Sequence, residues 1–184
     1  MAHHRRLPHI YPEGASLFIT FCLHGSANDL LLPPAGAVSG ETFVWLDRQL
    51  DGADRGPLCL RRPEIARVVD AAIHKGAQLG HYELHGYVVM SNHVHLLIRP
   101  MIAPDRLLKS LKGSSAREAN RLLGRTGEPF WQKESYDHWV RNRTEFLKIR
   151  AYIYNNPMKA GLVANPEDFP WSSAGVETSL DGAR

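Results

Sequence analysis

The sequence predicts an α+β fold in which helices cover one face of an antiparallel sheet. The expected elements follow the order strand, helix, strand, strand, helix, strand, helix. The two central strands are joined by a short link that suits a hairpin, and a hairpin makes neighbouring strands antiparallel. Hydrophobic residues form 43% of the 184-residue chain, which is enough for an ordinary core. We therefore predict one domain over residues 1–184, with a core from about 6 to 174 and short tails.

The first strand is predicted at Ser16 to Leu23, because this run is rich in aromatic and β-branched residues. A segment with several Pro and Gly residues follows. We expect a short helix at 41–50 and a longer one that begins at Pro63, a residue suited to the first helical position.

The second half of the chain supplies two more strands of a hairpin, a helix, a further strand and a last helix. In chain order these are expected at 82–89, 93–98, 105–123, 136–140 and 144–155. Pro157 is predicted to stop the last helix, because proline disfavours the helical conformation of the residue before it.

The charge and the termini limit the classes of protein that fit. The net charge is +3 and the isoelectric point is about 9.0, which mildly favours a polyanionic partner. Membrane spans need about 20 apolar residues, and no such stretch occurs in the sequence. The basic start of the chain has no apolar run behind it, so we expect a cytoplasmic protein without a signal peptide or membrane partner.

A pair of histidines, His93 and His95, is a candidate metal site. Side chains alternate along a strand, so both imidazoles are expected on one face while Val94 points toward the core. Two imidazoles so placed can bind one metal ion. The alternative is two polar residues on an exposed strand face, and the spacing alone does not decide between the two interpretations.

The last predicted helix has an apolar face and a polar one. The apolar face carries Phe146, Ile149 and Ile153, and the second face carries Glu145, Lys148, Tyr152 and Asn156. Tyr152 and Asn156 lie one turn apart and can reach one site. A tyrosine hydroxyl that attacks phosphorus forms a phosphotyrosine, and an amide oxygen nearby can bind a metal or a phosphate. The alternative is a tyrosine packed at the edge of the core. Among the other tyrosines, Tyr82 and Tyr87 are expected to pack on the hairpin, and Tyr154 lies near the wrong face for Asn156.

Basic and aromatic side chains form a second set of candidates, for contact with DNA. Lys109, Lys112, Arg117, Arg121 and Arg125 fall largely on one side of the predicted helix 105–123, where they can follow a DNA backbone or form an ordinary solvated face. The further candidates are Arg5, Arg6, Trp131, Tyr136, His138 and Arg141. The aromatic rings can stack on unpaired bases, although core packing competes for Trp131. His138 can also approach the metal.

Five segments together resemble one family. They are RRLPHIYPEGASLFITFCLHGS, GYVVMSNHVHLLI, LLKSLKGSSAREANRLLG, PFWQKESYDHWVRN, and IRAYIYNNPMKAGLV followed by PEDFPWSSA. In this order they resemble the REP-associated tyrosine transposases of the single-tyrosine HUH superfamily.

The resemblance implies a ferredoxin-like fold and a specific site. His93 and His95 correspond to the histidine pair, Tyr152 to the nucleophile and Asn156 to the residue that completes the metal site. The implied substrate is single-stranded DNA with hairpins, namely repetitive extragenic palindromes, and the implied metal is Mg²⁺ or Mn²⁺. The two imidazoles alone favour Mn²⁺ or Zn²⁺.

The sequence thus predicts a DNA nicking and rejoining nuclease that forms a 5′-phosphotyrosine at Tyr152. The metal is expected to polarise the scissile phosphate, and Lys148 is a candidate electrostatic helper. Two alternatives stay open: a DNA-hairpin-binding regulator without catalysis, and a zinc hydrolase that uses His93, His95 and a third ligand such as His138. The sequence leaves open whether the protein is a monomer or a homodimer.

Overall fold

Four antiparallel strands form the sheet in the computed structural model, which describes residues 12, 14–26, 50 and 56–177. The strands are β1 (Leu17–Cys22), β2 (Tyr82–Val89), β3 (His93–Pro100) and β4 (Tyr136–Trp139). Their order in the sheet is β2-β3-β1-β4, so the two central strands are β3 and β1. The predicted hairpin is confirmed, because β2 pairs with β3 in antiparallel register.

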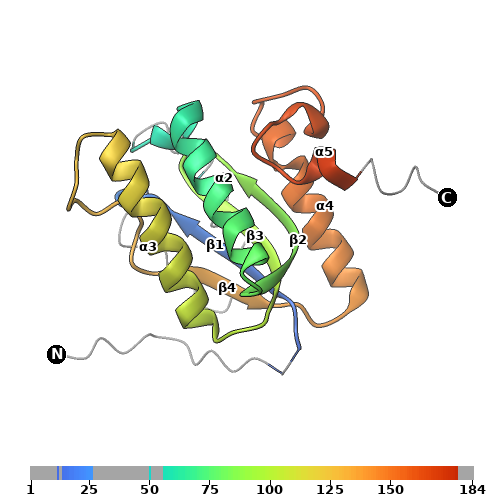
Figure 1. Ribbon diagram of the computed structural model, residues 1–184. Coiled ribbons are helices and arrows are strands. Elements are labelled where there is room, and N and C mark those ends of the chain that lie inside the picture. The colour runs from blue at the N-terminus through green and yellow to red at the C-terminus, as the bar shows by residue number, and fades with distance from the viewer. Residues whose placement is uncertain (1–11, 13, 27–49, 51–55, 178–184) are drawn as a thin grey trace, which may run out of the picture.

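Three long helices accompany the sheet (Figure 1). They are α2 (Pro63–Gln78), α3 (Pro104–Leu122) and α4 (Arg143–Lys159), and the short elements are η1 (Cys59–Arg61), η2 (Pro166–Asp168) and α5 (Ala174–Glu177). Helix α2 connects β1 to β2, and α3 connects β3 to β4. This β-α-β-β-α-β order with strand order β2-β3-β1-β4 is the ferredoxin-like arrangement, as expected.

The two faces of the sheet carry separate cores. On one face, β-strand residues such as Ile19 and Leu96 pack with Ile65 of α2 and Leu107 of α3. On the other, Phe18, Val88 and Leu97 pack with Ile149 and Ile153 of α4. The α+β prediction is confirmed, and α2 and α3 share one face as predicted. Helix α4 lies on the opposite face, where it covers Phe18 and Leu97, so the prediction that the helices share one face is wrong for α4.

Local hydrogen bonds fix where α4 begins. The side chain of Asn142 accepts a hydrogen bond from the backbone N–H of Glu145 at 2.9 Å. The Glu145 carboxylate reaches back and accepts from the backbone N–H of Arg141 at 2.7 Å. This reciprocal arrangement resembles a capping box and satisfies amides that a helix start leaves without intrahelical partners.

The end of α4 corrects the prediction that Pro157 stops the helix, because the helix continues to Lys159 with Pro157 inside it. The N–H of Leu162 donates to the Pro157 carbonyl at 2.9 Å, and the N–H of Gly161 donates to the Met158 carbonyl at 3.0 Å. Gly161 adopts φ +69°, which completes a Schellman motif. The termination signal therefore lies four residues after the proline.

Some predictions fall outside the described residues. They concern Arg5, Arg6 and nearly all of the expected helix at 41–50. In the part of the chain that the structure describes, no helix is both long and apolar enough to cross a bilayer.

Candidate metal and nucleophile site

The two histidines of β3 meet at one point on the α4 face of the sheet. Their Nε2 atoms lie 3.1 Å apart, and the residues are 0% and 1% exposed. Val94 and Leu96, which alternate with them, belong to the core on the other face. The alternative of an exposed polar face is thus excluded, because both imidazoles are enclosed.

Each imidazole is held from behind by a polar side chain. The Nδ1 atom of His93 lies 2.7 Å from Asn92 Oδ1. The Nδ1 atom of His95 lies 2.8 Å from Oγ1 of Thr20, the residue directly opposite it on β1. Asn92 and Thr20 are themselves 3% exposed. Metal-binding histidines commonly have such a partner at the second ring nitrogen.

The donor set fits one metal ion. Two nitrogens at about 2.1 Å from an ion are about 3.0 Å apart at an octahedral right angle and about 3.4 Å apart at the tetrahedral angle. The observed 3.1 Å separates two Nε2 atoms that face each other with their Nδ1 atoms already engaged. The spacing is thus compatible with a shared ion and does not select between the candidate metals.

Helix α4 brings the candidate nucleophile to this pair. The ring of Tyr152 meets the ring of His95 edge-on, with centroids 5.8 Å apart. His95 also stacks on Phe18, with ring centroids 5.4 Å apart. Asn156, one turn after Tyr152 on α4, is 1% exposed. The structure therefore places a tyrosine hydroxyl and an amide group on the helix that covers the histidine pair.

A lysine of α4 other than the predicted Lys148 lies over the Tyr152 ring. Lys148 is exposed. The Nζ atom of Lys159 instead lies 4.7 Å from the centroid of the Tyr152 ring. Residues seven apart lie on one side of a helix, so this spacing was a signal for Lys159 that sequence reasoning missed. It was missed because the helix was expected to stop before Pro157.

The basic residues of α3 lie in the opposite layer from the histidine pair. Helix α3 packs through Leu107, Leu111 and Ala119 on the sheet face that α4 does not cover. Of the predicted DNA contacts, Lys109 and Arg117 are exposed on this helix, and Arg121 forms an ion pair with Glu118 at 2.6 Å. These residues and the histidine pair therefore do not form one continuous site.

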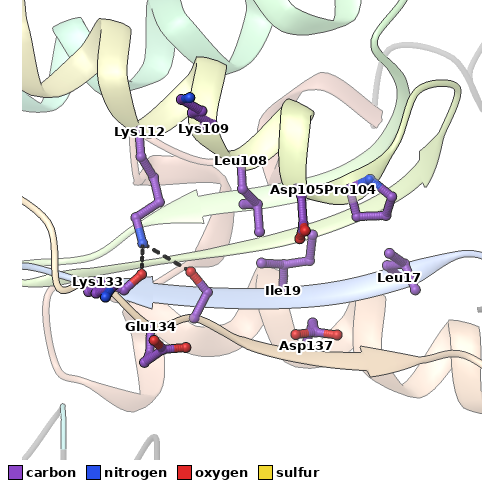
Figure 2. Close-up of a pocket in the computed structure, with 11 residues that line it drawn as sticks. Leu17, Ile19, Pro104, Asp105, Leu108, Lys109, Lys112, Lys133, Glu134 and Asp137 are labelled. Carbon is purple, nitrogen blue, oxygen red and sulfur yellow. Dashed lines mark hydrogen bonds between the residues drawn. The ribbon is translucent and has the colours of Figure 1, made fainter. Parts of the chain in front are cut away.

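Lys112 of α3 forms hydrogen bonds to the segment 132–135, which precedes β4. Its ammonium donates to the carbonyls of Gln132 and Lys133 and to the hydroxyl of Ser135, at 2.7, 3.1 and 3.1 Å. Figure 2 shows this side chain reaching from α3 toward Lys133, at the wall of a cavity of about 400 Å³. Because an ammonium has three donors, this geometry assigns Lys112 a structural role in place of the predicted contact with DNA.

Trp131 corrects a second predicted DNA contact. It is 7% exposed and lies in the core beneath α2 and α3. Its Nε1–H donates to Ser115 Oγ at 3.0 Å, and its ring meets Phe21 edge-on at 4.8 Å. Stacking on a base would require the core to open, so the competing expectation of core packing holds.

The remaining predicted aromatic contacts, Tyr136 and His138, lie on β4. Tyr136 is opposite Thr20, so Tyr136, Thr20 and His95 form a row across three strands. Burial, with the charges of Asp137 and Glu145, raises the pKa of Tyr136 to about 12. His138 Nε2 lies 2.9 Å from a Glu145 carboxylate oxygen. His138 is thus engaged with the start of α4, which does not support its approach to the histidine pair.

The tyrosines of the hairpin pack as predicted. Tyr82 is 3% exposed and donates to the carbonyl of Ile73 at 2.6 Å. Tyr87 is also 3% exposed and donates to Asp70 at 2.6 Å. Both belong to the core on the α2 side, away from the histidine pair.

Comparisons with known proteins agree with this arrangement. Residues 59–156, more than half of the chain, match the family model described as transposase, IS200-like. A REP-associated tyrosine transposase of Escherichia coli (strain K12) is 27% identical over 92 residues, which are 50% of this chain and 54% of the relative. The match thus spans about half the length of that curated relative.

A solved structure of a REP-associated tyrosine transposase bound to a REP hairpin has the same fold. Its TM-score is 0.64 at 20% identity, with 98% of this chain and 87% of that chain covered. The family model covers β2, β3, α3 and most of α4, and therefore both histidines and Tyr152. The chain belongs to the IS200-like transposase family.

Proposed function

We propose that this chain is a metal-dependent nuclease and strand transferase that cuts and rejoins single-stranded DNA through a 5′-phosphotyrosine at Tyr152. One observation carries the proposal: the ring of Tyr152 packs on His95, whose Nε2 lies 3.1 Å from that of His93. A candidate nucleophile and a candidate metal pair thus meet although they come from different layers. Membership of a transposase family supports the same reaction class.

The residues that would hold the metal are His93, His95 and Asn156. We propose Mg²⁺ or Mn²⁺, with phosphate and water oxygens as the other ligands. When bound, such an ion polarises the scissile phosphate and offsets the negative charge that develops on it.

The chain's own residues supply the nucleophile and its surroundings. The Tyr152 oxygen attacks phosphorus, its proton passes to solvent, and the bond from phosphorus to the 3′-oxygen breaks. The departing oxygen takes up a proton and becomes a 3′-hydroxyl, while the 5′-phosphate stays on Tyr152. Because the covalent link conserves the phosphodiester's free energy, rejoining is the reverse attack by a 3′-hydroxyl and needs no ATP.

Two lysines are candidates for the electrostatic help that the reaction needs. A free phenol has a pKa of about 10, so attack near neutral pH requires stabilisation of the phenolate. We propose Lys159 ahead of the sequence-based candidate Lys148, because its Nζ already lies 4.7 Å from the Tyr152 ring centroid. A cation there also attracts the phosphate to be cut.

The substrate that we propose is single-stranded DNA with hairpins of the repetitive palindromic type. The net charge of +3 suits a polyanion. The structural relative was solved with a REP hairpin bound, and the shared fold makes hairpin DNA the first substrate to test.

A covalent-adduct assay tests the proposal. The protein is incubated with 5′- and 3′-labelled hairpin oligonucleotides and Mg²⁺ or Mn²⁺, and the products are separated on a denaturing gel. We expect a protein adduct that carries only the DNA 3′ of the cut. Tyr152→Phe should abolish it, and Tyr154→Phe, two residues later on the same helix, should retain it. An adduct that survives Tyr152→Phe would contradict the assignment.

The same assay separates the alternatives. A zinc hydrolase would need a third protein ligand, yet no group of three or more His, Cys, Asp or Glu side chains suited to a metal occurs among residues 14–26 and 56–177. Cleavage without an adduct, supported by Zn²⁺ alone, would favour it nonetheless. Tight hairpin binding without cleavage in any of these metals would favour the regulator.

A further inference from the structure

The proposed metal ligands His93 and His95 can bind an ion only if their protons are on the right ring nitrogens. A neutral imidazole carries one proton, and the nitrogen that binds a metal must be the one without it. Both Nε2 atoms face the shared point, so metal binding requires both protons to be on Nδ1. The groups behind the rings, Asn92 and Thr20, decide whether this is the resting state.

Asn92 determines the tautomer of His93. Its Nδ2 donates to the carbonyl of Leu50 at 2.9 Å, and a carbonyl can only accept, so the orientation of the amide is fixed. The Oδ1 atom therefore faces His93 Nδ1, at 2.7 Å, and can only accept from it. His93 consequently carries its proton on Nδ1 and turns a lone pair on Nε2 toward His95.

Thr20 places no such restriction on His95. A hydroxyl can donate or accept, so the 2.8 Å contact between Oγ1 and His95 Nδ1 suits either tautomer. With no ion present, two opposed lone pairs 3.1 Å apart would repel, whereas a proton on His95 Nε2 makes a hydrogen bond to His93. Thr20 then donates to His95 Nδ1.

We propose that Asn92 and Thr20 are positioning residues with different tasks. Asn92 keeps His93 permanently in the metal-binding tautomer. Thr20 lets His95 exchange tautomers when an ion arrives: the Nε2 proton leaves, a proton is taken up at Nδ1, and the hydroxyl turns from donor to acceptor. No net proton is gained or lost. The inference rests on the proposed metal site, and it adds that the site is half preset and half switchable.

The first test is spectroscopic and needs no catalysis. Long-range ¹H–¹⁵N correlation of the imidazole nitrogens distinguishes the two tautomers, before and after addition of Mg²⁺. We expect His93 to show an Nδ1 proton in both states and His95 to change from an Nε2 to an Nδ1 proton. An Nδ1 proton on His95 before metal is added, or an Nε2 proton on His93, would overturn the proposal.

The second test compares matched variants of Thr20. Thr20→Val keeps the shape and removes the hydroxyl, whereas Thr20→Ser keeps the hydroxyl. Loss of such a partner behind a metal ligand typically lowers metal affinity about 10- to 100-fold. We expect this loss of Mn²⁺ affinity in Thr20→Val by calorimetry, and less than about a 3-fold change in Thr20→Ser. Equal affinities for both variants in folded protein, checked by circular dichroism, would contradict the role of Thr20.

A variant of Asn92 tests the other half. Asn92→Leu removes both amide interactions, and we expect His93 to acquire an Nε2-protonated population and Mn²⁺ affinity to fall. Wild-type tautomers in this variant would overturn the role of Asn92.

Failure of the inference and failure of the proposed function are distinguishable. If Mn²⁺ binding depends on His93 and on the Thr20 hydroxyl but no DNA adduct forms, the inference holds and the proposed reaction fails. If His93→Ala leaves Mn²⁺ binding unchanged, the metal site itself is wrong, and the inference falls with it.

Discussion

The two faces of strand β3 carry different kinds of side chain: one face is apolar, and the other holds the histidine pair. On the α2 and α3 face, Val94, Leu96 and Ile98 join a core of aliphatic and aromatic residues. On the α4 face, His93 and His95 replace what would otherwise be apolar residues, and their nitrogens meet 3.1 Å apart. One strand of eight residues thus serves a packing core and a polar cluster at the same depth of burial.

The difference shows how an enclosed polar site can be tolerated. Buried polar groups destabilise a fold unless each has a hydrogen-bond partner, and here Thr20 and Asn92 are the partners. The apolar face supplies most of the burial that offsets any remaining cost. We therefore expect substitutions on the two faces of β3 to separate activity from stability.

The largest expected effect comes from the polar face. His95→Leu keeps an approximately equal volume but removes one proposed ligand, so adduct formation should fall at least about 1000-fold, equivalent to a loss of about 4 kcal/mol. The free energy of unfolding should change by less than about 2 kcal/mol, because the apolar burial gained by the leucine offsets part of the cost of the hydrogen-bond partner that Thr20 and His93 lose. The adduct assay and urea unfolding measure the two quantities. Retained adduct formation in His95→Leu would contradict the proposal that the polar face of β3 is needed for activity.

The apolar face should behave in the opposite way. Leu96, next to His95 but 0% exposed on the other side, loses buried methyl groups in Leu96→Ala. We expect a loss of about 3 kcal/mol of stability, as for other buried leucines. Mn²⁺ affinity, measured by calorimetry well below the melting temperature, should stay near the wild-type value. A large loss of affinity with little loss of stability would contradict the separation of the faces.

A smaller effect is expected at Lys112, which links α3 to the segment before β4. Lys112→Met removes a charged donor to three acceptors, one of them at an exposed position, and a hydrogen bond to a charged group contributes about 1.5–3 kcal/mol net when its acceptor cannot turn to water. We expect a net loss of about 1–2 kcal/mol of stability, with no effect on the salt dependence of DNA binding. Lys109→Met, at an exposed position one turn earlier on α3, is the control and should not change the melting temperature. A reduced salt slope in Lys112→Met would restore the predicted DNA contact.

The smallest effect concerns pH and the link between β4 and α4. Burial alone would raise the pKa of Glu145. The pKa is nevertheless lowered from its usual 4.5, because the carboxylate accepts hydrogen bonds from the Arg141 backbone N–H and from His138 and lies near the side-chain charges of both residues. A lowered pKa means that the ionised carboxylate stabilises the fold above pH 4.5, and that this contribution is lost as the pH falls through the folded-state pKa.

Glu145→Gln tests this dependence. The variant should be less stable than the wild type by less than about 1 kcal/mol at pH 7, and the gap should close at lower pH. Thermal melts at several pH values between 7 and 3 measure it. A gap that widens on acidification would contradict the sign.

The sequence is sufficient for the fold class, the order of the elements and the faces of β3. Alternation alone places His93 and His95 on one face, and the short link between β2 and β3 predicts their hairpin pairing. The family resemblance singles out Tyr152, His93 and His95, and the structure places these three side chains in contact with one another around His95. The covering of both faces was not predicted, because the apolar side chains of a strand do not reveal which helix packs on them.

What could not be predicted depends on contacts between residues far apart in the chain. Thr20 supports His95 across 75 positions, and that pairing requires the register of β1 against β3. Lys112 and Trp131 are residue types common in DNA-binding surfaces. In the structure, Lys112 donates to the Gln132 carbonyl and Trp131 donates to Ser115 of α3. Lys159 was excluded by the assumption that a proline ends a helix, whereas a proline near the last turn leaves only a few backbone hydrogen bonds to lose.

The smaller apolar cluster under α4 has a consequence for local opening. Helix α4 is anchored by Ile149, Ile153 and the cap at Asn142, whereas β1 and β3 are enclosed on both sides. Amide hydrogens of α4 should therefore exchange with solvent through a lower-energy opening than those of the central strands. The proposed metal ligand His95 and the proposed nucleophile Tyr152 are in ring contact, but they belong to parts of the molecule with different resistance to unfolding.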